Sequence, residues 1–159
     1  MKILGGLLFL NLLFCGRALA DAGVVLVDGL VEHPLTLSAA DLVSSPATEL
    51  DNTTLTGHGS ESAHYKGVAL WWLVEHAGFV VEPGAKRADL RHYLLVTGRD
   101  GYQIVVSMGE IDPDFEAKPA ILAYDRDGKP LGANGLRIVI PGDKHGGRMV
   151  HDVVHIEVK

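Results

Sequence analysis

Short apolar runs separated by turn residues dominate the chain from Leu90 onward. Residues 93–97 and 102–106 are two such runs, and the glycine- and aspartate-bearing residues 98–101 between them predict a hairpin. Similar runs follow, at residues 121–124, 136–140 and 150–158. Strand signals with few helical signals between them favour a mixed, largely antiparallel α+β sandwich or barrel.

The first half of the chain predicts shorter elements. Residues 24–37 hold apolar runs around an Asp-Gly turn, which predicts strands with a tight reversal. Ser38 and Asp41 have the spacing of a capping box that opens a short helix. The polar residues 49–64 predict a strand that runs into an exposed loop.

Residues 68–77 are the best helix candidate. Four apolar side chains share one face at helical spacing, and Gly78 stands where a left-handed C-terminal residue is wanted. Trp71 and Trp72 lie beside that face. Packing is the usual role of such a pair, and stacking on a ligand is the alternative.

The N-terminal residues predict export. Residues 1–20 have a positive start, an apolar centre and a small-residue exit, which is the pattern of a signal peptide. We expect cleavage after Ala20 and a periplasmic location, which leaves residues 21–159 as a single domain. A retained anchor and lipidation at Cys15 are the alternatives.

Charge and cysteine content exclude several functions. The chain carries a formal charge of −6, and the predicted leader holds cations but no acid, so the exported part is more acidic. Such a surface repels nucleic acid and anionic lipid, and no later stretch is apolar enough to insert into a membrane. The only cysteine, Cys15, lies in the leader, so the exported part has no disulfide and no sulfur ligand for a metal.

The histidines and serines lack the patterns of catalytic sites. His151 and His155 would lie about 13 Å apart along a strand, too far to share one ion. No second close pair accompanies His58 and His64. The serines have no nucleophile-elbow context, and no phosphate-binding glycine loop is present. We therefore expect neither a metal site nor a catalytic residue.

Residues 136–151 form the most distinctive segment. A strand ends in Pro-Gly, a glycine-bearing loop follows, and Arg148 enters the next strand. Arg137, Lys144 and Arg148 concentrate positive charge in an acidic protein. The plain alternative is a hairpin whose arginines pair with surface acids.

This segment resembles the closing part of the sulfite-oxidase-type molybdopterin-binding domain. Weaker similarities follow in the same order along residues 24–158, at Val27-Asp28-Gly29, Leu35-Thr36-Leu37, Tyr65-Lys66-Gly67-Val68-Ala69-Leu70, Asp100-Gly101-Tyr102 and Asp127-Gly128-Lys129-Pro130-Leu131. The resemblance implies that α+β fold for the whole exported part.

Two departures from the family pattern bear on function. Where catalytic members of the family place the metal-binding cysteine, this chain has residues 56–60 and no thiol. The lysine that follows the glycine-arginine pair in sulfite oxidases corresponds to His151. Redox catalysis by molybdenum is therefore not expected.

Small exported proteins of this fold without the cysteine resemble periplasmic pterin-binding proteins. That resemblance implies a non-enzymatic protein that binds a reduced pterin of the monapterin or biopterin type. It also implies a partner, the periplasmic domain of a membrane-bound cyclic-di-GMP cyclase or phosphodiesterase that controls biofilm formation. The candidate ligand-binding residues are Arg148, His145, Gly146, Gly147, Arg137, His151, Tyr102, Trp72 and Asp100.

Two other functions remain open from the sequence. One is a molybdopterin-dependent oxidoreductase, or a subunit of one, that lacks a protein thiolate ligand. The other is an interaction domain that has lost its ligand.

Overall fold

The structure, a computed structural model, describes residues 23–81, 83–84, 86–132 and 135–159. The predicted signal peptide lies outside these residues. The elements follow in the order β1 Val24–Gly29, β2 Leu35–Ser38, α1 Ala39–Ser44, β3 Thr48–Thr56, β4 Gly59–Ala69, α2 Leu70–Ala77, η1 Ala88–Arg91, β5 Tyr93–Gly98, β6 Gln103–Ser107, α3 Met108–Ile111, β7 Ile121–Arg126, β8 Lys129–Pro130, β9 Arg137–Val139, η2 Gly146–Arg148 and β10 Val153–Val158.

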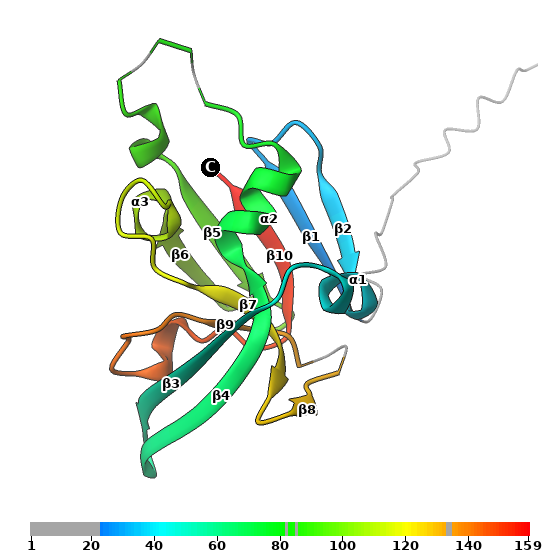
Figure 1. Cartoon of the computed structure of the whole chain (residues 1–159), viewed down its shortest axis with the longest axis vertical. Helices are drawn as coiled ribbons and strands as arrows, with labels where there is room; N and C mark the ends of the chain where they lie inside the picture. The colour runs from blue at the N-terminus through cyan, green and yellow to red at the C-terminus, as the bar shows by residue number, and fades with distance from the viewer. Residues whose placement is uncertain (1–22, 82, 85, 133–134) are drawn as a thin grey trace, which may run out of the picture.

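Two sheets make up the domain (Figure 1). The first has the strand order β2-β1-β10-β5-β6, and the second has the order β3-β4-β7-β8, with β9 also paired to β7. Strands β1 and β10 pair in parallel and bring the two ends of the described chain together, whereas the other strand pairs are antiparallel. The predicted mixed, mostly antiparallel α+β architecture is confirmed.

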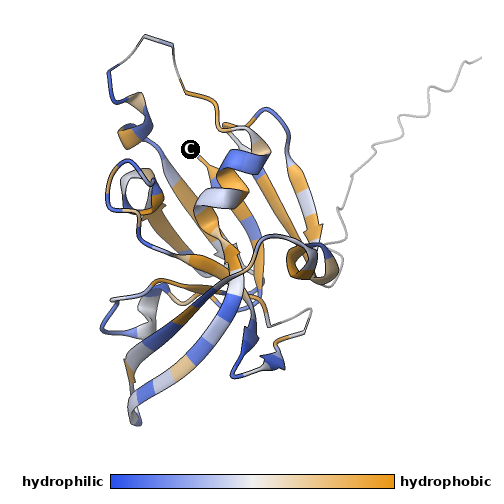
Figure 2. Cartoon of the chain, in the orientation of Figure 1, coloured by the Kyte–Doolittle hydropathy of each residue, from blue (hydrophilic) through white to orange (hydrophobic). Residues whose placement is uncertain are grey.

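The main core joins both sheets to α2. Buried side chains from β1, β4, β5, β7 and β10 pack with the apolar face of α2. Figure 2 shows β1, β5, β7 and β10 as largely hydrophobic, whereas the β3-β4 hairpin is largely hydrophilic. A smaller cluster lies on the second sheet and consists of Ala63, Tyr65, Ile121, Ala123 and Val139.

Both predicted helices form. Ser38 caps α1, and the Ser38 and Asp41 side chains make the reciprocal hydrogen bonds of a capping box. Helix α2 ends at the left-handed residue Gly78, as expected. It begins later than predicted because Val68 and Ala69 still pair with β7. No helix in the described ranges has the length and apolarity that a membrane span requires.

The strand predicted within residues 49–64 forms as β3, but the predicted exposed loop was wrong. Instead of a loop, a second long strand, β4, follows and pairs with β3 in an antiparallel hairpin joined at Gly57 and His58. The positions of β3 that face inward include Asn52 and Thr54, so polar side chains occupy places where a strand pattern normally has apolar ones.

Candidate functional site

A pocket of about 200 Å³ lies between the β3-β4 hairpin and the loop that connects β9 to β10. We call it the hairpin pocket. Its lining combines hydroxyl, amide, guanidinium and imidazole groups with a few apolar side chains, from Asn52, Thr54, Thr56, Glu61, Ala63, Tyr65, Arg126, Arg137, Gly146, Met149 and His151.

Strand β3 supplies three polar side chains to one wall. Asn52, Thr54 and Thr56 alternate along the strand and therefore project to the same face. Asn52 is only 5% exposed and Thr54 only 8% exposed. Neither side chain hydrogen-bonds to any residue that the structure describes. Their polar atoms are not among the enclosed unpaired side-chain atoms of the described residues, which are His92 Nε2 and Asp152 Oδ1, so they face the pocket and are available to a ligand or to water.

Arg137 and His151 form the wall opposite the hairpin. An isolated bridge pairs their backbones. The Arg137 guanidinium makes one long hydrogen bond, from Nε to the Gly135 carbonyl at 3.5 Å, and no ion pair within the described ranges. Loss of solvent around the imidazole and the charge of Arg137 lower the pKa of His151. The pair therefore offers a guanidinium beside a histidine that is mainly neutral near pH 7.

Arg126 and Glu61 form an ion pair at the rim of the pocket. The Arg126 guanidinium also lies over the Tyr65 ring, 5.9 Å from its centroid. Arg126, and Arg137 at longer range, hold the pKa of the Glu61 carboxyl below its ordinary value. The pocket thus contains a carboxylate whose charge is already partly balanced.

The loop that closes the pocket is attached to the hairpin. The Leu55 backbone N–H donates to the Lys144 carbonyl at 2.8 Å, and Leu55 pairs with His145. His145 and Gly146 line a small hollow of about 10 Å³ next to the hairpin pocket. Two of the predicted site residues therefore lie at the pocket or beside it.

Arg148 has a different position from the one expected. Its guanidinium bonds to both oxygens of Asp143, at 2.9 and 2.7 Å, and to both oxygens of Glu110, at 3.1 and 3.3 Å. These contacts raise the pKa of Arg148. Against the effect of burial, the Ser107 backbone N–H and then Arg148 hold the pKa of Glu110 below its ordinary value. Arg148 does not line the hairpin pocket. It ties the loop to α3.

The remaining predicted site residues lie outside the hairpin pocket. The Tyr102 hydroxyl donates to the Gly147 carbonyl at 2.6 Å, and Asp100 accepts the Tyr102 backbone N–H at 2.9 Å. Trp72, on α2, stacks on His76 with ring centroids 4.6 Å apart. Tyr102 and Asp100 therefore position the loop and a turn, while Trp72 packs against the main core and does not line the pocket.

Sequence reasoning found part of the pocket and missed the rest. It identified Arg137, His151 and Gly146 because they belong to one unusual segment. It missed the residues that the hairpin and β7 contribute, Asn52, Thr54, Thr56, Glu61, Ala63, Tyr65 and Arg126, and it did not select Met149 from the loop before β10. The period-two repetition of polar side chains at positions 52, 54 and 56 was the available signal.

The described residues contain no group of three or more histidine, cysteine, aspartate or glutamate side chains placed to hold a metal ion. The side chains that line the hairpin pocket are instead hydrogen-bond donors and acceptors that suit an organic molecule.

Comparisons with known proteins identify the family. Residues 20–159 match the oxidoreductase molybdopterin binding domain. The uncharacterized oxidoreductase YuiH of Bacillus subtilis (strain 168) is 30% identical over 107 residues, which are 66% of this chain and 48% of YuiH. The chain therefore spans about half the length of this curated relative.

The fold is also found in a solved structure. The sulfane dehydrogenase SoxCD from Paracoccus pantotrophus superposes with a TM-score of 0.67 at 22% sequence identity, over 87% of this chain and 38% of that one. At this identity the similarity concerns the fold, which is the sulfite-oxidase-like one expected from the sequence. Since the family match includes every described residue, this protein belongs to the oxidoreductase molybdopterin-binding domain family.

Proposed function

We propose that the protein binds a reduced pterin in the hairpin pocket and acts as a periplasmic sensor rather than as an enzyme. The observation that carries this proposal is the pair Asn52 and Thr54, which are largely buried, line the pocket and make no side-chain hydrogen bond in the described chain. Their polar atoms open to the pocket, where a bound group can donate to them or accept from them.

The chemistry of the pocket suits a pterin ring. A pterin is flat, apolar on its faces and hydrogen-bonding around its edge, and its amino-pyrimidine edge prefers a carboxylate such as Glu61. Asn52, Thr54 and Arg137 would bind the carbonyl and ring nitrogens, and Met149 would contact a face. The volume is below the roughly 300–1,000 Å³ of ordinary small-molecule sites, so one bicyclic ring suits it better than a complete molybdopterin.

The residues present do not suit a thiolate-ligated molybdenum. The chain has a single cysteine, Cys15, which precedes every described residue. Thr56 lines the pocket, but its hydroxyl donates to the Gly59 carbonyl at 3.0 Å and accepts the His58 N–H, so it serves the hairpin turn. We therefore derive no redox step at this site.

Protein purified from its native compartment should release a pterin and should contain far less than one molybdenum per chain. The expected ligand follows from the buried donors and acceptors, and the expected metal content follows from the absence of a thiolate ligand. Mass spectrometry of the released small molecules, together with elemental analysis, makes both measurements. Recovery of about one molybdenum per chain would contradict the proposal and favour the alternative below.

The alternative is a molybdopterin-dependent oxidoreductase, or a subunit of one, without a protein thiolate. The family itself favours it, as do the names oxidoreductase and dehydrogenase borne by YuiH and SoxCD. Turnover of a redox substrate by the metal-loaded protein would support this alternative.

A sensor also needs a partner that responds to ligand occupancy. We propose the periplasmic domain of a membrane-bound cyclic-di-GMP cyclase or phosphodiesterase that controls biofilm formation. The contact surface would include the end of the β3-β4 hairpin, because Thr56 and Glu61 line the pocket there and Leu55 is 49% exposed. Ligand binding can change the partner's affinity only if the loaded and empty surfaces differ.

Pull-down from membranes should recover that enzyme, with a yield that changes when a reduced pterin is added. Leu55→Glu should reduce recovery at least severalfold, because a charge replaces an apolar contact at the proposed interface. Leu26→Glu is the matched control, since Leu26 is also exposed, at 37%, but belongs to β1. Equal recovery with both variants, or no membrane partner in either ligand state, would contradict the proposal.

A further inference from the structure

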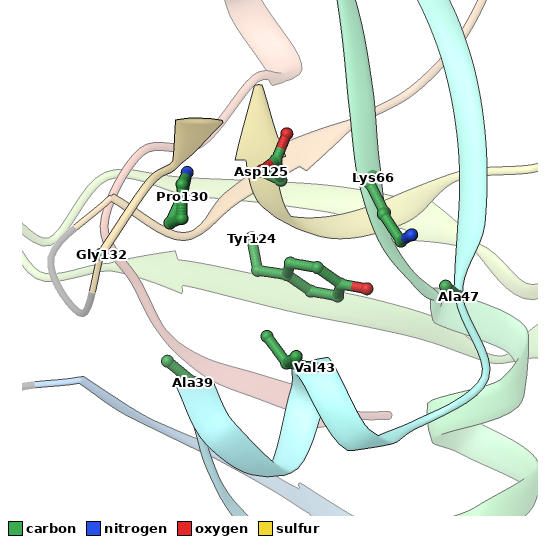
Figure 3. Close-up of a pocket in the computed structure, with 8 residues that line it drawn as sticks. All are labelled: Ala39, Val43, Ala47, Lys66, Tyr124, Asp125, Pro130 and Gly132. Carbon is green, nitrogen blue, oxygen red and sulfur yellow. The ribbon is translucent and has the colours of Figure 1, made fainter. Parts of the chain in front are cut away.

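A second and larger hollow lies between α1 and the second sheet (Figure 3). We call it the α1 hollow. Its volume of about 440 Å³ is within the roughly 300–1,000 Å³ of small-molecule sites. It is lined by Ala39, Val43, Ala47, Lys66, Tyr124, Asp125, Pro130 and Gly132, none of which lines the hairpin pocket.

The two cavities lie on opposite faces of the second sheet. Consecutive residues of a strand project to opposite faces. On β4, Tyr65 lines the hairpin pocket and Lys66 lines the α1 hollow. Tyr124 belongs to the main core cluster, whereas Tyr65 belongs to the smaller cluster on the other face. A ligand in one cavity therefore does not touch the walls of the other.

A β-bulge places Tyr124 in the α1 hollow. Lys66 pairs with Asp125 and Gly67 pairs with Ala123, so Tyr124 is an extra residue on β7. Bulges of this kind redirect side chains and occur often beside functional sites. Figure 3 shows the Tyr124 ring extending across the hollow above α1, with its hydroxyl toward Lys66 and Ala47.

The Tyr124 hydroxyl lacks a hydrogen-bond partner. Tyr124 is only 7% exposed, and its hydroxyl bonds to no described residue. The hydroxyl is not one of the enclosed unpaired side-chain atoms of the described residues, so it is accessible from the hollow. It can donate and accept a hydrogen bond there, and the other walls are mainly alanine, valine and proline.

Lys66 adds a cationic donor at the same end of the hollow. Its ammonium bonds to the Glu49 carboxylate at 2.9 Å. An ammonium has three N–H donors, so others remain for a ligand. The Asp125 carboxylate points away from α1 in Figure 3, and among the smaller influences its charge helps to raise the pKa of Lys66, after the larger effect of Glu49.

We propose that the α1 hollow binds a small organic carboxylate with an apolar body. The carboxylate accepts hydrogen bonds from the Tyr124 hydroxyl and the Lys66 ammonium, and the apolar body packs on α1, where Val43 is 60% exposed. This site is independent of the pterin proposed above and remains testable if that proposal fails.

The test is titration of the full exported chain with 3-phenylpropionate, followed by NMR. Binding should be saturable, and the amide shifts should map to α1 and β7. Tyr124→Phe keeps the ring and removes only the hydroxyl, so it should weaken binding roughly threefold to tenfold. Lys66→Met should weaken it similarly, and the neutral 3-phenylpropionamide should bind less tightly to the wild-type protein.

Two further variants test whether the probe binds in the α1 hollow and not in the hairpin pocket. Glu49→Gln should tighten binding of the carboxylate, because the Lys66 charge is then unbalanced. Arg137→Met should leave binding unchanged, because Arg137 lies on the other face of the sheet. Any one of three results overturns the proposal. The first is that the probe does not bind saturably, and the second is that wild type, Tyr124→Phe and Lys66→Met bind it equally. The third is that Arg137→Met loses binding. A thermal melt of each variant identifies any loss of fold.

Discussion

Replacing Gly67 by alanine should lower the free energy of unfolding by about 3 kcal/mol, near the upper end for an overpacked position. A Cβ at this position would lie 2.3 Å from the Leu122 carbonyl oxygen and 2.6 Å from the Ala123 Cα. Both atoms belong to the backbone of β7, which pairs with β4 and β9 and cannot shift freely. No side-chain rotation can therefore relieve the clash of the alanine Cβ with β7.

Thermal and urea unfolding measure this effect, which corresponds to a loss of roughly 10 °C in Tm for a domain of this size. Gly57→Ala is the matched control, because a Cβ there meets no atom within 4 Å and needs no left-handed backbone. Similar stabilities of the two variants would contradict the close approach of β4 and β7. Since Gly67 adjoins the bulge at Tyr124, Gly67→Ala should also perturb the α1 hollow.

Local signals in the sequence predicted the elements that local contacts form. The capping box of Ser38 and Asp41, the left-handed Gly78 and the hairpin at residues 98–101 each depend on neighbours within a few positions. The pairing of β1 with β10 could not be predicted in this way, because it joins residues more than a hundred positions apart.

The full extent of the β3-β4 hairpin was missed for a different reason, although a strand was predicted at its start. A strand is recognised by apolar side chains on alternate positions, and here Asn52 and Thr54 occupy the buried positions. Polar residues at buried positions weaken the alternation of apolar and polar side chains by which a strand is predicted. The same two residues carry the proposal for ligand binding, and sequence patterns are expected to fail most often at such sites.

The arginines of residues 136–151 show that charge composition does not predict which cations are free to bind a ligand. The sequence offered two interpretations of the cationic segment, ligand binding or pairing with acids. The structure pairs Arg148 with Asp143 and Glu110, and it leaves Arg137 without an ion pair within the described ranges. Whether an arginine pairs with an acid depends on acids that are distant in the chain, such as Glu110. Composition and spacing do not show where the fold places those acids.

Arg137→Met should therefore weaken binding of a reduced pterin by about 10- to 100-fold, the equivalent of roughly 1–3 kcal/mol for the loss of a charged hydrogen-bond donor. Methionine retains much of the aliphatic volume, and the lost guanidinium has no carboxylate partner in the described chain that would be left unpaired. Stability should change little. Calorimetry under reducing conditions measures the affinity, and a thermal melt measures the stability.

Arg148→Met and Arg87→Met distinguish a ligand contact from a change in charge alone. Arg148→Met leaves the Asp143 and Glu110 carboxylates without their shared cation, so it should lower Tm and weaken binding only through the loop that it ties to α3. Arg87 lies over the Phe115 ring, away from the hairpin pocket, so Arg87→Met should leave pterin affinity unchanged. If Arg137→Met binds as tightly as Arg87→Met, the guanidinium in the pocket does not contact the ligand and the site assignment fails. If Arg148→Met loses affinity while its Tm is retained, Arg148 rather than Arg137 is the direct contact, and the loop must open in the bound state.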